Sequence, residues 1–508
     1  MPQNQQNHNM KHIGILSAFF AVVAAAVAQT STNAPAARSM SLQDCVQEAL
    51  SHNFDVQVQR INPQISLYNL DAAYSGYDPT FSISGTHTYQ VSPSSYSSYT
   101  TNATPASISD ENSFSSGIKG GLLPWGLQYD FSAGLSETYG NNGRPFDNSS
   151  GNIGVVTLSQ PLLKNFWIDS TRLNIRVAKN RLQFSEQGLR QQIITTVTAV
   201  ANAYYDLIYA QQNVQVQQQA LNLAQTQLDQ DNQRVQIGTL AILSVQQDES
   251  QAAQSKANLI AAQSALDTDQ NNLKNLLTDN YAQWHDRDIQ PSETLAAPLQ
   301  SFDLQNSWNK GMAERPDLLQ ARLNVEQQGI QLKFNRNQLL PDLELTGSYG
   351  YRGAGREFDN AVDQTVEGNA PNYTYGATLS IPLGNINARN QYKSTKAALQ
   401  QVELQFKQLE QNILVLIDNA VKTAQSDYQS VQARKQARIY AEAALDAEQK
   451  TYAVGKATTF EVLTYQNNLT TARLNEIQAL DNYNKDLANL ASQEGSTLEH
   501  FNINIEAK

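Results

Sequence analysis

Residues 80–91 read Thr-Phe-Ser-Ile-Ser-Gly-Thr-His-Thr-Tyr-Gln-Val, with a polar side chain at every second position. Successive side chains of a β-strand point to opposite faces, so one face of this segment carries hydroxyl and amide groups and the other carries Phe, Ile, Tyr and Val. Residues 342–351 and 372–381 alternate in the same way, with Leu and Tyr on the apolar face. Segments of about ten residues with one tyrosine-bearing apolar face are typical of strands that cross an outer membrane.

The N-terminus carries the features of a secretory signal peptide, which we predict over residues 1–28. Two basic residues precede a sixteen-residue apolar run, 13–28, that ends in Ala-Val-Ala, a cleavage site of the A-x-A type. Met10 is an alternative start to Met1, because the nine residues before it are polar. A soluble antiparallel sheet would also alternate. Export, and the lack of other segments to cover the apolar strand faces, favour a membrane sheet.

The composition excludes several classes of protein. Charged residues make up 16% of the 508 residues, and the formal net charge is −12, a balance that argues against a nucleic-acid-binding protein. A single Cys rules out a disulfide framework and a zinc site built on several thiolates. The sequence also lacks a G-x-x-x-x-G-K-[ST] phosphate loop, a G-x-S-x-G motif and an H-E-x-x-H motif. We therefore expect neither an enzyme nor a bound cofactor or metal.

The chain contains two related halves with the same order of segments. Pro79 and Pro341 each begin a strand-like segment, and Gln-Pro-Leu at 160–162 is matched by Ile-Pro-Leu at 381–383. Two copies of this length do not indicate a solenoid. The predicted organisation is a signal peptide (1–28), a first repeat (41–278, with strands at about 79–160), a linker (279–300), a second repeat (301–495, with strands at about 341–382) and a C-terminal tail (496–508).

Each half also contains helical segments of unusual length. A helix over 169–236 would span about 100 Å at 1.5 Å per residue, and no globular core requires so long a helix. A seven-residue apolar series in the following segment predicts coiled-coil packing: Val245, Ala252, Leu259, Leu266 and Leu273. The predicted helices are 42–73, 169–236 and 241–277 in the first half, and 304–338, 385–453 and 458–491 in the second.

The two strand regions differ in length. Residues 92–112 and 353–371 are rich in Ser, Asn, Gly and Pro, and we expect them to form loops. Residues 113–139, with a turn at Pro-Trp-Gly (124–126), predict an additional hairpin in the first half. The fold class that follows is mainly α with a transmembrane β part.

Taken together, these motifs resemble the TolC family of outer-membrane efflux proteins. The resemblance covers nearly the whole mature chain, from Ser-Leu-Gln-Asp-Cys at 41–45 to Ser-Gln-Glu-Gly at 492–495, and includes Arg-Pro-Asp-Leu at 315–318. It implies a homotrimer whose strands share one β-barrel in outer-membrane lipid and whose helices build one periplasmic tunnel. Oligomerisation would close a sheet that one chain cannot close. The family norm of four strands per chain and the additional hairpin leave the count open at four or six.

The resemblance also implies a function and partners. The chain would be a passive exit duct of a tripartite efflux or type I secretion system, with a long periplasmic extension. Its partners would be a periplasmic adaptor (membrane fusion) protein and an inner-membrane pump or transporter. The sequence identifies neither the cargo nor the pump. An exported coiled-coil structural or adhesin-like protein is the alternative, because heptads alone do not distinguish a tunnel wall from a closed rod.

Two sets of candidate site residues follow from the resemblance. The first set consists of the two helical turns, which would form the periplasmic tips that dock the adaptor: Ile237, Gly238, Thr239, Leu240, Val454, Gly455, Lys456, Ala457 and Thr458. The second set matches the family's acidic gate just beyond the turns: Glu461, Thr464, Ser244 and Asp248. Both sets have an alternative explanation. The glycines turn the chain in any case, and Glu461 is a favourable acid in the first turn of a helix.

Overall fold

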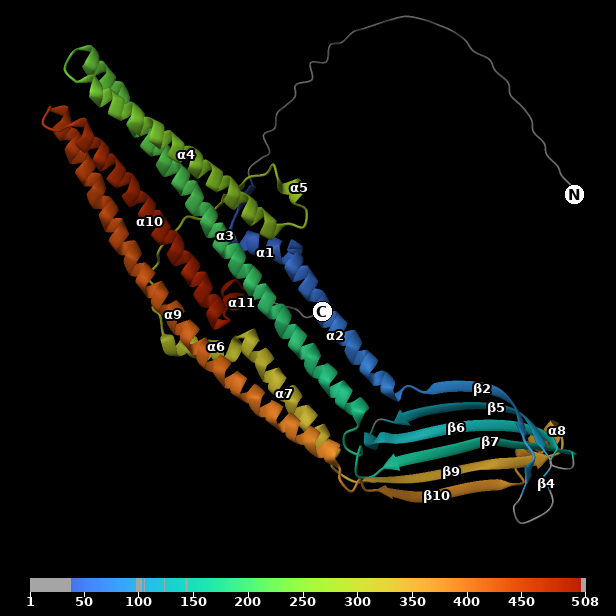
Figure 1. Cartoon of the computed structure of the whole chain (residues 1–508). Coiled ribbons are helices and arrows are strands. Elements are labelled where there is room, and N and C mark those ends of the chain that lie inside the picture. Colours follow the sequence, from blue (N-terminus) through green and yellow to red (C-terminus); the bar gives the residue numbers. More distant parts are fainter. Residues whose placement is uncertain (1–37, 97–102, 105, 123, 142–144, 504–508) are drawn as a thin grey trace, which may run out of the picture.

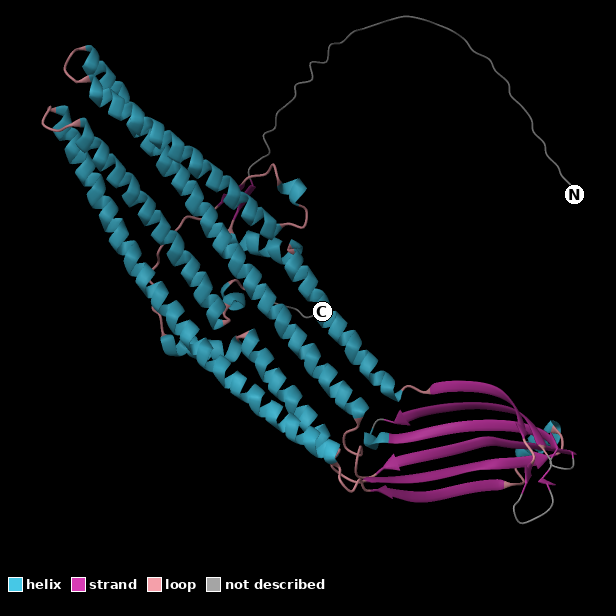
Figure 2. Ribbon diagram, viewed as in Figure 1, coloured by secondary structure: helices cyan, strands magenta, loops and turns pink. Residues whose placement is uncertain are grey.

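In the computed structural model, the long helices and the large sheet occupy separate parts of the molecule and meet at one end (Figures 1 and 2). The predicted signal peptide, 1–28, lies outside the described residues, as does the end of the predicted tail, 504–508. The structure describes residues 38–96, 103–104, 106–122, 124–141 and 145–503.

The long helices form where the sequence predicts them. In each half a helix of nearly seventy residues turns back into a helix of 36 residues, and the two antiparallel pairs lie side by side (Figure 1). The helices of the first half are α1 (Leu42–His52), α2 (Phe54–Tyr74), α3 (Ser170–Gln236) and α4 (Ile242–Leu277). Those of the second half are α6 (Leu304–Glu314), α7 (Pro316–Asn337), α9 (Ile386–Ala453) and α10 (Thr459–Glu494). Short helices α5 (Tyr281–Trp284) and α11 (Thr497–His500) follow α4 and α10.

The segments before the strands are each broken into two helices, where the sequence predicted one. In the first half Asn53 ends α1 and caps α2, because its side-chain oxygen accepts the backbone N–H of Asp55 at 2.9 Å. In the second half Arg315 is extended, with φ −63° and ψ 122°. The ring of Pro316 excludes the helical conformation for the residue before it. The predictions of unbroken helices over 42–73 and 304–338 were therefore wrong at equivalent places in the two halves.

The two antiparallel helix pairs are joined along α3 and α10. Arg473 on α10 donates to Gln219 on α3 at 2.9 Å, and Lys485 on α10 forms an ion pair with Asp206 on α3. Large buried side chains close the interior beside this contact. The main cluster includes Met40, Tyr204, Leu207, Leu273 and Ile289, and a second one includes Leu318, Ile413, Ile417, Val421 and Leu490.

The predicted linker, 279–300, packs into the main cluster. Its strand β8 (Ile289–Pro291) pairs in parallel with β1 (Arg38–Met40). The hydroxyl of Tyr204 in α3 donates to the carbonyl of Met40 at 3.0 Å, which ties this small sheet to the long helix. None of the described helices combines the length and the apolar character needed to cross a bilayer.

The large sheet has six antiparallel strands in the order β10-β9-β7-β6-β5-β2, so the strand number left open by the sequence is six. The predicted additional hairpin is β5 and β6, joined through residues 124–126. The preceding linker is shorter than predicted, because pairing with β2 extends β5 back to Ser107. The strands are β2 (Thr80–Ser92), β5 (Ser107–Leu122), β6 (Leu127–Asn141), β7 (Pro145–Pro161), β9 (Asp342–Gly355) and β10 (Pro371–Ser380).

The strand register gives this sheet two different faces. On the apolar face, Phe81 lies opposite Ile118, which in turn lies opposite Phe131. On the hydroxyl face, side-chain hydroxyls pair across strands, with oxygen–oxygen distances of 2.8 Å for Ser84–Ser115, 2.6 Å for Thr86–Ser113 and 2.8 Å for Ser136–Ser150. Phe81 is 64% exposed in the single chain, so the fold of one chain leaves the apolar face uncovered at its helical end.

The predicted loop 353–371 contains a helix, α8 (Phe358–Glu367), and that part of the prediction was wrong. The segment folds because Ala361 and Thr365, one turn apart, are buried against the outer end of the sheet. Gly368, with φ 67°, ends the helix in the left-handed conformation. A composition rich in Gly and Asn therefore concealed a short amphipathic segment.

Candidate functional site

The two helical turns lie next to each other at the end of the molecule farthest from the sheet (Figure 1). Gly238 has φ 75° and Gly455 has φ 73°, the left-handed conformation that reverses the chain with little strain only at glycine. A Cβ atom at either position would meet no atom within 4 Å. Backbone conformation, not crowding, therefore requires glycine here.

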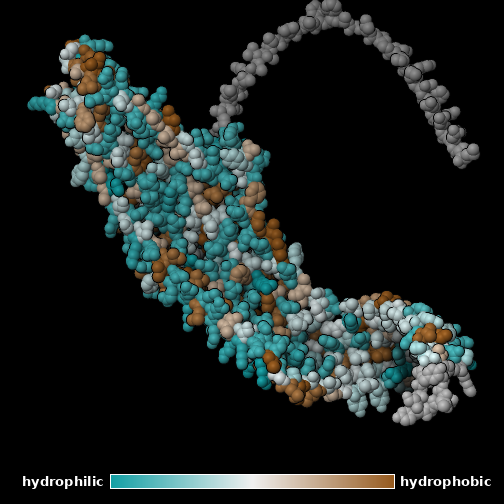
Figure 3. Space-filling model, viewed as in Figure 1, coloured by the Kyte–Doolittle hydropathy of each residue, from teal (hydrophilic) through white to brown (hydrophobic). Residues whose placement is uncertain are grey.

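Both turns expose apolar side chains at their outermost points. Ile237 is 74% exposed and Val454 is 69% exposed. Three further exposed residues belong to the first turns of the returning helices, and sequence reasoning missed them: Ile242, Leu243 and Phe460. Apolar residues in a first helical turn ordinarily face inward, so nothing in their spacing distinguished them. Figure 3 shows brown, hydrophobic atoms at this end of the molecule.

Glu461 lies in a capping box at the start of α10. Its carboxylate accepts the backbone N–H of Thr458 at 2.7 Å and the hydroxyl of Thr458 at 2.9 Å. The backbone hydrogen bond and then the hydroxyl hydrogen bond lower the pKa of Glu461. One turn further on, Thr464 is exposed and donates to the carbonyl of Phe460 at 2.8 Å. The fold of one chain therefore gives Glu461 a structural role, and its place in a pore stays a prediction.

The two candidates from the first half are placed differently from Glu461. Ser244 is half-buried in the first turn of α4. Asp248, one turn later, is fully buried, and neither of its carboxyl oxygens has a hydrogen-bond partner among the described residues. The structure therefore does not bring Asp248 onto the exposed surface that carries Glu461 and Thr464.

Asp231 on α3 is the centre of a buried polar cluster beside Asp248. It is 0% exposed and accepts the Tyr452 hydroxyl at 2.7 and 2.6 Å and the Thr459 hydroxyl at 3.2 Å. The guanidinium of Arg234 lies 4.5 Å from the centroid of the Tyr452 ring and 3.7 Å from a carboxylate oxygen of Asp231. Because Tyr452 and Thr459 belong to α9 and α10, this cluster connects the two helix pairs near their tips.

The electrostatics of Asp248 follow from this burial. Loss of solvent, and then the facing carboxylate of Asp231, raise the pKa of Asp248 to about 7. Sequence reasoning singled out Asp248 but not Asp231 or Tyr452. Their pairing joins residues 221 positions apart, and no local pattern carries that information.

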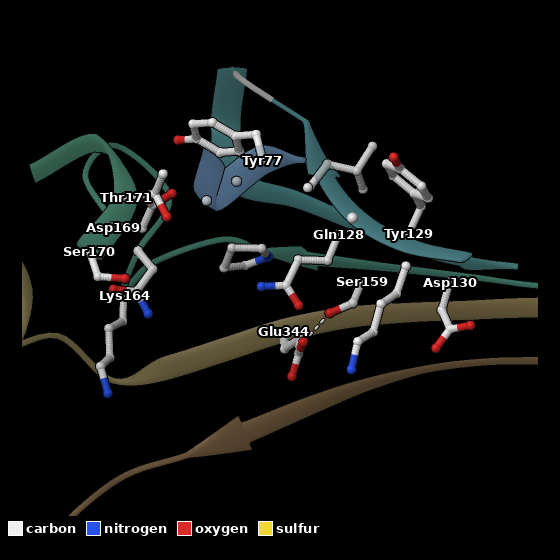
Figure 4. Close-up of a pocket in the computed structure, with 18 of the residues that line it drawn as sticks. Tyr77, Gln128, Tyr129, Asp130, Ser159, Lys164, Asp169, Ser170, Thr171 and Glu344 are labelled. Atoms are coloured by element: carbon white, nitrogen blue, oxygen red, sulfur yellow. Dashed lines mark hydrogen bonds between the residues drawn. The ribbon is translucent and has the colours of Figure 1, made fainter. Parts of the chain in front are cut away.

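A concave region lies where the hydroxyl face meets the helices (Figure 4). This cavity has a volume of about 730 Å³ and is lined by η1 (Ser75–Tyr77), the starts of α3 and β9, and parts of β5, β6 and β7. Ser159 and Glu344 point toward each other and are hydrogen bonded, and Lys119 lies opposite Asp130 in the strand register. Within the described part of the chain, no group of three or more His, Cys, Asp and Glu side chains could hold a metal ion.

Replacement of Asp248 by Asn should reduce the pH dependence of stability. The unfolded carboxyl has a pKa of 3.8 and the folded one about 7, so folded protein keeps a proton that unfolded protein releases between these values. The contribution of Asp248 to the free energy of unfolding of the wild type therefore falls as pH rises through this window and is constant above it. Asp248→Asn should raise the thermal midpoint of helix loss at pH 8 and change it little below pH 4.

Asp231→Asn is the matched control for this substitution. Asp231 accepts hydrogen bonds from three side-chain donors. Asp231→Asn should therefore lower the thermal midpoint at both pH values. Circular dichroism melts of the two variants and the wild type measure the difference. Equal pH slopes for wild type and Asp248→Asn would contradict the assignment.

Comparison with known proteins places this architecture in a family. A model of the family described as outer membrane efflux protein matches residues 45–278 and 309–496. Outer membrane protein TolC of Escherichia coli (strain K12) is 25% identical over 319 residues, which cover 60% of this chain and 62% of that protein. TolC of Vibrio cholerae serotype O1 is 23% identical over 360 residues, covering 69% of this chain and 78% of the other. The match thus spans less than two thirds of the Escherichia coli protein.

Solved structures show the same fold. The Campylobacter jejuni CmeC outer membrane channel superposes with a TM-score of 0.64 at 15% identity, covering 90% of this chain and 86% of that one. The outer-membrane channel OprN superposes with a TM-score of 0.66 at 14% identity, covering 90% of each chain. The family model matches well over half of the sequence, which confirms the resemblance to the TolC family. The chain therefore belongs to the outer membrane efflux protein family and is a protein of the outer membrane.

Proposed function

We propose that three copies of this chain form a passive exit duct, with the sheets closed into a barrel in outer-membrane lipid and the helices extended into the periplasm. The observation that carries the proposal is the sheet itself, with one exposed apolar face and one face of paired hydroxyls. Lipid matches the first face and a water-filled lumen matches the second. The 67 residues of α3 give the periplasmic part a length of about 100 Å.

Closure by further copies is supported by the two free edges of the sheet, and the number three is taken from the resemblance to the family. β2 and β10 are the terminal strands, and unpaired backbone groups at such edges are costly in lipid. β2 leaves the helices and β10 returns to them, so β10 of one chain can pair antiparallel with β2 of the next around a threefold axis. Three chains of six strands would give eighteen, about one and a half times the diameter of a twelve-stranded barrel.

The hairpin β5–β6 is the source of the larger strand number. It lies inside the sheet between β2 and β7, not at an edge, so it widens the wall without changing the strands that meet the neighbouring chain. Serine and threonine dominate the hydroxyl face, and the charged side chains Lys119, Asp130 and Glu344 gather at its helical end beside the cavity. Cargo leaving the tunnel would meet these charges first.

The tips are the proposed contact for a periplasmic adaptor protein. Their exposed apolar residues, led by Ile237 and Val454, make no contribution to the core of this chain and offer a small surface for the ends of adaptor helices. The energy for transport would come from an inner-membrane pump joined through that adaptor, because the sequence carries no phosphate-loop motif. An exported structural rod would leave the two faces of the sheet without a purpose.

Arginine on the apolar face should prevent insertion. Leu345 and Leu379 are 44% and 57% exposed on this face, and an arginine near the bilayer midplane costs about 2–4 kcal/mol. Leu345→Arg and Leu379→Arg should therefore lower the yield of trimer that resists carbonate extraction from membranes. Thr346→Arg and Thr378→Arg, on the adjacent hydroxyl-face positions, are matched controls that should insert. Normal yield for both leucine variants would contradict the orientation of the sheet.

Cysteines at the tips should cross-link to the adaptor. Thr239 and Lys456 are exposed at the two turns, and the native Cys45 does not compete, because burial raises the pKa of its thiol to about 12. Thr239→Cys and Lys456→Cys should each form adducts with the cognate adaptor when a short bifunctional reagent is added to cells. Ser264→Cys is the control, because Ser264 is exposed on α4 at a position farther from the tip. Adducts at that site alone would reject tip-to-tip docking.

Glu461 is the residue through which the proposed gate is tested. Three symmetry-related carboxylates facing one pore would favour cations and raise one another's pKa, which opposes the lowering by the cap. Glu461→Ala should weaken the cation preference of conductance in planar bilayers, and Glu461→Lys should reverse it. Glu461→Gln retains a capping side chain without charge. A changed cation preference in Glu461→Ala but not in Glu461→Gln would show that Glu461 acts only as a helix cap.

A further inference from the structure

Helix α8 rests on a seat made of glycines at the outer end of the sheet. A Cβ atom on Gly353 of β9 would lie 2.1 Å from the Ala361 carbonyl oxygen and 2.3 Å from the Thr365 hydroxyl oxygen. A Cβ atom on Gly151 of β7 would lie 3.1 Å from that same hydroxyl. The two glycines therefore allow the helix to pack directly on the backbone of the sheet.

The seat belongs to the apolar face. Gly151 lies opposite Leu135 in the strand register, and a Cβ on Gly151 would touch the Leu135 side chain at 2.8 Å. The neighbouring pair, Ser136 and Ser150, forms its hydroxyl contact on the other face. α8 consequently lies outside the wall of the proposed barrel and does not obstruct the lumen.

The position of α8 along the strands is marked by two tyrosines. Tyr349 and Tyr351 lie on the apolar face of β9, with ring centroids 5.6 Å apart and hydroxyl oxygens 3.1 Å apart. A Cβ atom on Gly368, which ends α8, would be 3.4 Å from the Tyr351 ring. Aromatic girdles of membrane barrels lie at the boundary between acyl chains and headgroups. The C-terminal end of α8 therefore reaches that boundary.

The part of α8 that does not contact the seat carries an apolar stripe, an acidic stripe and two exposed amides, Asn360 and Gln364. Phe358, Val362 and Val366 are spaced by four residues beside the seat; Phe358 is 43% exposed and Val366 is 72% exposed. The next stripe around the helix is acidic, and all of its members are exposed: Asp359, Asp363 and Glu367. An apolar stripe between the seat and an acidic stripe is the pattern of a helix lying in a membrane interface.

We propose that α8 is an interfacial helix whose apolar stripe contacts outer-leaflet lipid beside the barrel wall, while its acidic stripe stays in water. In this proposal the apolar stripe extends the lipid contact of the apolar face past Tyr351, beside which α8 ends. This inference rests on the proposed function, which places the sheet in lipid. It gives the outer end of the wall a device that fixes how deeply the barrel sits.

A neighbouring chain is a less suitable occupant for the apolar stripe. α8 packs on β9, β7 and β6, whereas the next chain of the trimer would join at β10 and β2, the edges of the sheet. β10 therefore lies between the helix and one seam, and β5 and β2 lie between it and the other.

Site-directed spin labelling of the trimer in phosphatidylethanolamine–phosphatidylglycerol vesicles tests the proposal. A nitroxide is attached to Val366→Cys, to the acidic-stripe control Asp363→Cys, and to Leu345→Cys as the reference for lipid contact. The buried Cys45 stays unlabelled. Collisions with molecular oxygen report lipid, and collisions with a water-soluble nickel chelate report water. The oxygen-to-nickel ratio at 366 should be several-fold higher than at 363 and close to the ratio at 345.

The outcomes separate this inference from the proposed function. A lipid signal at 345 with a water signal at 366 would overturn the role of α8 and leave the barrel intact. A water signal at 345 would reject the barrel itself. Shielding of the label at 366 from both reagents would show a protein contact and would also overturn the proposal. Gly353→Val, which fills the seat, should lower the ratio at 366 while leaving that at 345 unchanged.

Discussion

The unpaired backbone groups at the two edges of the sheet constrain the rest of the molecule. One chain folds six strands with continuous pairing from β10 to β2. Among the described residues no segment pairs with the outer edge of either terminal strand, and α8 covers only the outer end of the apolar face. In lipid such edges are satisfied only when the sheet closes on itself. In the proposed trimer, closure by three chains would fix a threefold axis, and each helix pair would then stand beside that axis. The periplasmic architecture proposed here follows from that requirement at the other end of the molecule.

The helical part is held together by polar groups as well as by its core. Lys485 and Arg473 link α10 to α3 along the middle of the wall, and Asp231 with Tyr452 links α3 to α9 near the tips. A buried carboxylate with several donors is costly to separate from its partners. The facing Asp248 has the reverse effect on stability, because burial and the like charge of Asp231 disfavour its ionised form. The tip region thus combines the stabilising hydrogen bonds of Asp231 with Asp248, whose ionisation destabilises the same region as pH rises.

At the outer end of the sheet, the position of α8 leaves the hydroxyl face uncovered. The connection from β9 to β10 spans fifteen residues, Arg356–Ala370, and could have folded over the hydroxyl face, which would line the proposed barrel. Instead α8 packs on Gly151 and Gly353 on the apolar face, where only the absence of a Cβ permits the contact. The hydroxyl face stays free of this segment. In the proposed barrel the additional hairpin would widen the lumen, so neither α8 nor the hairpin would obstruct the passage.

The sequence by itself determined the elements that repeat over many residues. The two-residue alternation of 80–91, 342–351 and 372–381 identified strands and their faces, and the length of 169–236 identified a helix beyond the needs of a globular core. The glycine turns and the additional hairpin were also readable, because Gly238, Gly455 and Pro-Trp-Gly at 124–126 act on the backbone locally. The breaks at Asn53 and Arg315 and the helix within 353–371 were missed. A single capping residue, or a helix of ten residues such as α8, gives only a weak signal against the pattern of the surrounding sequence.

Tertiary structure decided the contacts that join distant residues. Asp231 and Tyr452 are 221 positions apart, and α8 is helical because Ala361 and Thr365 meet glycines on two strands, one of them from the other half of the chain. Burial of Asp248 likewise depends on how α4 packs against α3. Periodicity is a property of neighbours along the chain, so it reports which face of an element is apolar. It carries no information on which other element that face will meet. That is why the Asp231–Tyr452 cluster near the tips and the contact of α8 with the sheet became visible only in the folded molecule.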